Sequence, residues 1–279
     1  MMKKVFPILI VILLFIFGIG LLAYPTLSDW LAKRGQSIAV QNYDQRTIEM
    51  NAKNIEEEFK KAEEYNDALS GANIKDPFVP ESGYVLPENY LSILNIDDTI
   101  GYINIPKIDV NLPIYHGTDD EVLQKGVGHM EMTAFPIGGE GNHAVLTGHT
   151  GIPSAKFFTD LTELEMGDVF YIVVLNQTIA YEVDQILVVK PDETDSLKPV
   201  KGEDYVTLVT CTPYGINSHR LLVRGTRIPY EEAVKLQEEN LQNAEINWRL
   251  VMIVSFVVLS LLAFIAYKVI DRRKMRKRR

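Results

Sequence analysis

The chain has 279 residues, of which 47% are hydrophobic and 23% charged, and its formal net charge at pH 7 is −9. That length allows one sizeable core, and the composition allows membrane segments besides. Between Pro25 and Trp248 the chain has 17 basic and 36 acidic side chains, a net charge of −19. Such acidity argues against a nucleic-acid partner, and solubility is its simplest explanation.

Two uncharged stretches have the length of membrane-spanning helices. Val5–Tyr24 is a run of 20 residues preceded by two lysines, and Leu250–Tyr267 is a run of 18 followed by the basic tail, residues 271–279. Each matches a hydrocarbon core of ~30 Å. Since the basic flanks lie before the first run and after the second, both termini are expected in the cytoplasm and the middle outside the cell membrane.

The first of these stretches allows two interpretations. Residues 1–24 are either an uncleaved anchor or a signal peptide that is removed. The apolar run is longer than a usual signal-peptide core and no clear A-x-A cleavage site follows it, so an anchor is favoured. Under both interpretations the middle of the chain is exported.

The exported part begins with a helical region and a linker. Residues 25–71 contain few glycines or prolines and have apolar residues at helical spacing, so one or two helices are predicted there. Residues 72–88 contain three prolines and are predicted to be a linker.

Residues 89–230 contain short segments typical of β-strands, and the predicted fold is mainly β, a closed or partly closed barrel. Residues 231–249 return to helical composition and lead into the second membrane segment, residues 250–270. The expected strands are Gly101–Ile105, Val110–Tyr115, His143–Thr147, Val169–Leu175, Thr178–Val189, Tyr205–Thr210 and Arg220–Arg224.

Cys211 is the single cysteine of the chain, so it cannot form an internal disulfide. A lone exported thiol is either a small buried apolar residue or a reactive group. It ends one predicted strand, and a loop, Thr212–His219, leads to the next. If the two strands pair as a hairpin, Arg220 lies roughly opposite Cys211, about 5 Å away across the strands.

A thiol attacks a carbonyl carbon as thiolate, which a nearby imidazole favours. Of five histidines, His149 follows an apolar strand between glycines, a position expected for a catalytic group at a barrel rim. His143 begins the same strand and is expected at its opposite end. His219 is expected in a loop, and His116 and His129 in turn-rich segments. Because neither CxxC nor HExxH occurs, no metal is expected, and since the sequence has no phosphate-binding glycine loop, no cofactor is expected either.

Two motifs around Cys211 and His149 resemble those of a known family. TLVTC, ending at Cys211 with Arg220 nine residues later, and LTGH, ending at His149, resemble the sortases, cell-surface cysteine transpeptidases of Gram-positive bacteria. The longer patterns HTGIPSAKFFTDL and CTPYGINSHRLLVRG, the two uncharged stretches and a DPF tripeptide are similar to the class C, pilus-assembling sortases. The resemblance covers roughly Leu27–Arg227 and implies a sortase-type barrel with N-terminal helices.

The resemblance also implies roles. Cys211 matches the family nucleophile, His149 the general acid/base, and Arg220 the residue that stabilises the oxyanion and positions substrate. Arg224 and Arg227 are rival arginines, expected to be structural or exposed. Sortases cleave an LPXTG-like sorting signal between Thr and Gly through a thioester, and in class C a pilin lysine then resolves it as an isopeptide bond. The expected partners are therefore pilin subunits with such signals and an acceptor lysine.

The DPF tripeptide, Asp76, Pro77 and Phe78, is a lid by the same resemblance. Asp76 would pair with Arg220, and Phe78 would cover Cys211. Composition alone favours an ordinary connector instead.

Two other functions remain open. A housekeeping sortase would use the same residues to join proteins to a cell-wall amine, although the DPF tripeptide and the C-terminal apolar stretch argue against it. A non-enzymatic, membrane-anchored pilus scaffold would not need Cys211.

Overall fold

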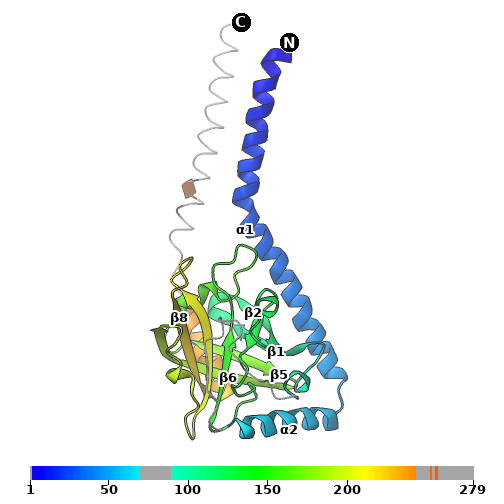
Figure 1. Ribbon diagram of the computed structural model, residues 1–279, viewed down its shortest axis with the longest axis vertical. Helices are drawn as coiled ribbons and strands as arrows, with labels where there is room; N and C mark the ends of the chain where they lie inside the picture. Colours follow the sequence, from blue (N-terminus) through cyan, green and yellow to red (C-terminus); the bar gives the residue numbers. More distant parts are fainter. Residues whose placement is uncertain (1, 70–88, 243–251, 253–254, 257–279) are drawn as a thin grey trace. The chain divides into compact units, whose positions relative to one another are not determined.

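The computed structural model describes residues 2–69, 89–242, 252 and 255–256 (Figure 1). Contacts divide the chain into two units, residues 1–238 and 239–279, and the barrel lies in the first. Two helices precede the barrel, α1 (Met2–Glu49) and α2 (Ala52–Ala68), and α4 (Tyr230–Gln242) follows it. The predicted N-terminal helices are thereby confirmed.

In the described part of the chain, eight strands close into a barrel in the order β1-β2-β3-β4-β7-β8-β6-β5. The pairs β2–β3 and β4–β7 are parallel and the rest antiparallel. The predicted closed barrel is confirmed. The strands are β1 (Thr99–Ile105), β2 (Val110–His116), β3 (Val127–His129), β4 (Asn142–Thr147), β5 (Val169–Val174), β6 (Gln177–Val189), β7 (Asp204–Thr212) and β8 (His219–Ile228).

Short helical turns link the strands. A four-residue helix, α3 (Asp120–Leu123), precedes β3. The 3-10 turns are η1 (Tyr90–Ser92), η2 (Pro106–Ile108), η3 (Thr159–Glu163) and η4 (Asp195–Leu197).

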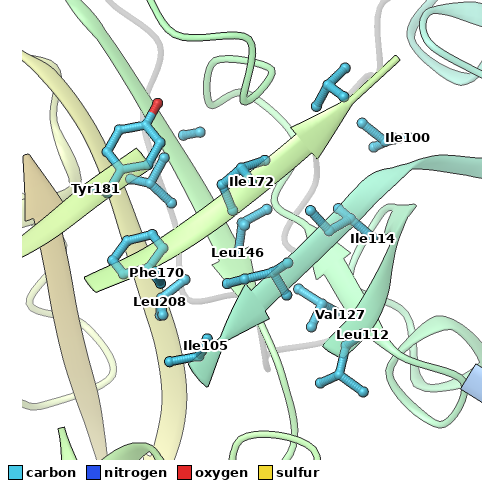
Figure 2. Packing of buried hydrophobic residues seen from close by; sticks show 14 of the residues in the cluster. Ile100, Ile105, Leu112, Ile114, Val127, Leu146, Phe170, Ile172, Tyr181 and Leu208 are labelled. Atoms are coloured by element: carbon cyan, nitrogen blue, oxygen red, sulfur yellow. The ribbon is translucent and has the colours of Figure 1, made fainter. Parts of the chain in front are cut away.

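Apolar side chains from nearly every strand fill the barrel (Figure 2). Phe170 and Tyr181 stack there with ring centroids 5.5 Å apart. Gly225 lets the Phe170 ring approach the backbone, since a Cβ at this position would lie 2.5 Å from the ring. Full burial of one such aromatic side chain stabilises the fold by roughly 1.5–3 kcal/mol.

Helix α1 packs along β1 and β2. Its buried residue Tyr43 donates its hydroxyl proton to the Ile100 carbonyl at 2.9 Å and accepts the Leu175 N–H at 2.7 Å. Lys33 pairs with Asp109 at 2.6 Å. The helix is therefore joined to the barrel by several polar contacts besides its apolar ones.

The prediction of membrane spans finds no support in the described residues, among which no helix is long and apolar enough to cross a membrane. Val5–Tyr24 forms part of α1. Most of Leu250–Tyr267 lies outside the described residues, as does the predicted linker, residues 72–88.

Candidate active site

Cys211 and Arg220 lie side by side near the ends of two neighbouring strands. Cys211 is the second-last residue of β7, Arg220 is the second residue of β8, and the antiparallel register pairs them directly. The predicted hairpin arrangement is confirmed. A half-buried cysteine and an arginine that is 8% exposed therefore meet at one end of the barrel.

Both side chains face outward from the barrel. Val209 and Leu222 belong to an apolar cluster separate from the barrel core. Successive side chains of a strand point to opposite faces, so Cys211 and Arg220 share the outer face with these two residues. The alternate residues Leu208, Leu221 and Val223 belong to the core inside.

His149 reaches the same end of the barrel because β4 runs parallel to β7. Beyond the last paired residue of β4, the Gly148 N–H still donates to the Val209 carbonyl at 3.0 Å. The Thr210 hydroxyl donates to the Gly148 carbonyl at 2.7 Å. The chain thus runs alongside β7 as far as Gly148. The next residue, His149, therefore lies level with Cys211.

The loop after β4 is held against the core at its start. The Phe158 N–H donates to the His149 carbonyl at 3.1 Å, which closes residues 149–158 into a compact loop. Gly148 allows this approach, because a Cβ there would lie 2.7 Å from the Phe158 ring. A larger residue at 148 would push the loop that begins with His149 outward.

The loop between β7 and β8 lies against the His149 loop. A Cβ at Gly151, where φ is +73°, would lie 3.3 Å from the Tyr214 ring. Tyr214 and Ile216 are 70% and 72% exposed. The loop that joins Cys211 to Arg220 therefore carries two exposed apolar side chains.

Burial lowers the pKa of His149 below its ordinary value, and the negative charge of Asp120 partly opposes this. The imidazole is therefore mainly neutral near pH 7, the form that accepts a proton. Arg220 Nη1 donates to the carbonyls of Asn217 and His219, each at 3.2 Å. These bonds hold the guanidinium at the end of the β7–β8 loop.

The rival arginines lie in ion pairs, as expected of structural residues. Arg224 binds Asp184 with two hydrogen bonds of 2.9 and 2.7 Å and stacks over Tyr205. Arg227 donates to Asp204 at 3.1 Å. In the register of β7 and β8, both lie further from Cys211 than Arg220 does.

Three other histidines are buried. His143, at the start of β4, lies 2.7 Å from the Thr207 hydroxyl, and burial lowers its pKa to about 4. His129 stacks on Phe135, and burial lowers its pKa to about 3. The sequence predicted turn-rich segments at His116 and His129, but both residues end strands. Both are hydrogen-bonded, His116 to the Ile93 carbonyl at 2.7 Å.

Two further expectations concern a metal and the lid. No group of three or more His, Cys, Asp or Glu residues within the described ranges could hold a metal ion. Asp76, Pro77 and Phe78 lie outside the described residues, so the lid stays a prediction.

Comparison with known proteins found a family model, described as a sortase domain, that matches residues 103–228. A solved sortase C-1 from Streptococcus pneumoniae is 48% identical, with a TM-score of 0.66 and coverage of 69% of this chain and 98% of that one. A pilus-related sortase C of group B Streptococcus is 45% identical, with a TM-score of 0.65 and coverage of 69% and 98%. Sortase D of Bacillus subtilis is 32% identical over 46% of this chain, which spans 63% of that relative.

Proposed function

The chain belongs to the sortase family of transpeptidases, in its class C branch, and we propose that it joins pilin subunits to one another through their sorting signals. One observation carries the proposal. A thiol, a guanidinium and an imidazole that is mainly neutral come together at one end of the barrel, from β7, β8 and the loop after β4. This is the set of groups that acyl transfer through a cysteine requires.

In the proposed first step, Cys211 is the nucleophile and His149 its base. The sulfur attacks the Thr carbonyl of an LPXTG-like signal while the neutral imidazole accepts the thiol proton. Arg220 donates to the oxyanion of the tetrahedral intermediate. The Thr–Gly amide bond then breaks, His149 returns the proton to the leaving glycine amine, and a thioester remains.

In the second step, the amine of a pilin lysine attacks that thioester. The lysine nitrogen forms an isopeptide bond to the Thr carbonyl, the carbon–sulfur bond breaks, and His149 removes the proton that the amine loses. His149 passes that proton to the leaving thiolate, which restores the thiol of Cys211 and the neutral imidazole. Because a thioester is an activated acyl group, the free energy of the cleaved amide bond is kept for the new one.

The test is a reaction of the purified protein with a sorting peptide. Without acceptor, we expect a mass increase on Cys211 equal to the acyl fragment, and with a lysine-containing pilin, an isopeptide-linked product. Acceptance of a cell-wall-type amine in preference to lysine would favour the housekeeping function. No adduct and no turnover would contradict transpeptidation and favour a scaffold.

We also propose that the protein lies in the cell membrane, with the barrel outside and both termini in the cytoplasm. The support is the sequence alone, two uncharged runs with basic flanks at their outer ends. Protease added to intact protoplasts should degrade the barrel and spare a C-terminal tag, which permeabilisation should then expose. A tag that is digested from outside would contradict this topology.

A further inference from the structure

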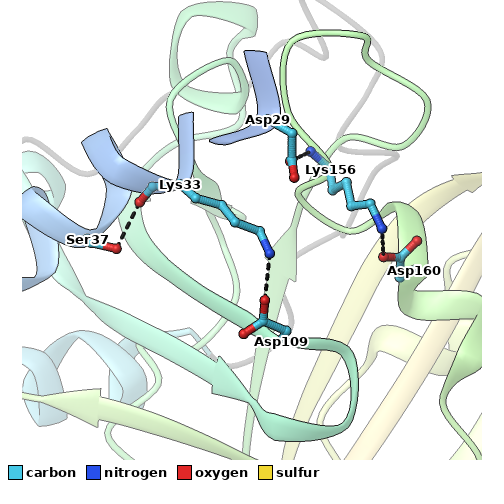
Figure 3. Close-up of polar contacts among 6 residues, drawn as sticks. All are labelled: Asp29, Lys33, Ser37, Asp109, Lys156 and Asp160. Carbon is cyan, nitrogen blue, oxygen red and sulfur yellow. Dashed lines mark hydrogen bonds and ion pairs between the residues drawn. The ribbon is translucent and has the colours of Figure 1, made fainter. Parts of the chain in front are cut away.

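Helix α1 reaches across to the loop that begins with His149 (Figure 3). Asp29 Oδ1 accepts the Lys156 backbone N–H at 2.9 Å, although the two residues are 127 positions apart in the chain. The neighbouring Ser28 hydroxyl lies 2.7 Å from the Pro153 carbonyl. Ser28 also lies 2.8 Å from the Tyr24 carbonyl of its own helix, so its single hydroxyl proton is shared between the two carbonyls. The hydrogen bond to Asp29 is therefore the stronger of the two links to the loop.

The side chain of Lys156 is held as well as its backbone. Its Nζ pairs with Asp160 at 2.7 Å. The hydrogen bond to Asp160 is the main reason that the pKa of Lys156 is raised, and the charge of Asp29 adds to it. Lys156 is therefore held between a carboxylate of α1 and one of its own segment.

The backbone just after Lys156 is in a conformation that needs such support. Phe157 has a φ of +40°, in the left-handed region that a bulky residue rarely occupies. Its ring is buried, and the Thr159 N–H donates to the Lys156 carbonyl at 2.7 Å. Burial of Phe157 and the hydrogen bonds of the Lys156 N–H and carbonyl together keep the chain in this turn.

A displacement at Lys156 would be passed on to His149. Phe158, two residues after Lys156, donates its N–H to the His149 carbonyl and packs its ring against Gly148. The Gly151 N–H donates to the Thr159 hydroxyl at 3.1 Å. The beginning and end of loop 149–158 therefore move as one piece.

We propose that Asp29 is a positioning residue for the transpeptidation. By accepting the Lys156 N–H, it fixes loop 149–158 and so keeps the imidazole of His149 at the end of the barrel where Cys211 lies. The inference rests on the proposed role of His149 and adds a part of the chain outside the barrel to the machinery of the site.

The test compares three variants with wild type. Asp29→Ala removes the acceptor, Asp29→Asn keeps an acceptor oxygen without the charge, and Lys33→Met breaks the Lys33–Asp109 pair one turn further along α1. For Asp29→Ala we expect kcat for the sorting peptide to fall about tenfold with KM changed less than about twofold, because a misplaced catalytic group slows the reacting step. Asp29→Asn should recover most of kcat, and Lys33→Met should match wild type.

Hydrogen exchange supplies a readout that does not depend on activity. The amides of residues 150–158, apart from Pro153, should exchange faster in Asp29→Ala than in wild type or Lys33→Met. Melting temperatures should agree within a few degrees, since a surface contact adds little to global stability.

The outcomes distinguish the positioning role of Asp29 from the proposed transpeptidase function. Faster loop exchange with an unchanged kcat would overturn the positioning role, and so would an equal loss of kcat in Lys33→Met, which would indicate general loosening of α1. Absence of turnover in wild type would overturn the proposed function and this inference with it, while exchange would still report whether Asp29 holds the loop.

Discussion

Cys211→Ala is expected to abolish thioester formation and pilin joining while leaving the fold intact. No other cysteine exists in the chain to replace the nucleophile, so the loss should be on the order of 10⁴-fold or more. The thiol is only half-buried on the outer face of the barrel, so exchanging SH for H removes little apolar contact. Mass spectrometry of the protein after incubation with a sorting peptide measures the adduct directly.

The control for this variant is its thermal unfolding, which should stay within a few degrees of wild type. If Cys211→Ala still forms linked pilins, the assignment of the nucleophile is wrong. If it unfolds at a much lower temperature, Cys211 is a packing residue, the alternative that its solitary occurrence left open.

The hairpin that pairs Cys211 with Arg220 was predictable because it is local. Two strands with apolar and β-branched residues are separated by a short loop containing proline and glycine, and antiparallel pairing across such a loop sets the register. The sequence also predicted most of the other strands. It did not predict β3, because three residues with a central glycine show no alternation.

The position of His149 depends on pairing that no local pattern reveals. Its strand, β4, lies beside β7 in parallel, and about sixty residues separate His149 from Cys211. The motif around His149 therefore had to be interpreted through a family resemblance. The contact between Asp29 and Lys156 is more distant still. Lys156 lies in the pattern HTGIPSAKFFTDL, but Asp29 belongs to no motif, so only the structure brings the contact into view.

Arg220→Lys is expected to lower kcat/KM for the sorting peptide by about 10²–10³, the usual cost of losing one oxyanion donor. Lysine keeps the positive charge, but its ammonium has neither the planar shape nor the forked donors of a guanidinium. Arg220 is almost buried, and Nη1 is already committed to the carbonyls of Asn217 and His219. The lysine side chain is shorter and ends in one nitrogen, so it cannot keep those bonds and also donate toward a substrate at Cys211.

Arg224→Lys is the matched control, because Arg224 lies on the same strand and lysine likewise lacks the forked N–H donors of a guanidinium. Arg224 uses its fork to bind Asp184, so this variant should lower the melting temperature and leave kcat/KM within about threefold of wild type. A rate near wild type for Arg220→Lys would mean that charge alone stabilises the oxyanion. A large loss of rate for Arg224→Lys with little change for Arg220→Lys would move the role to Arg224. Because the register places Arg224 opposite Thr207, four residues before Cys211, we expect the loss of rate at Arg220.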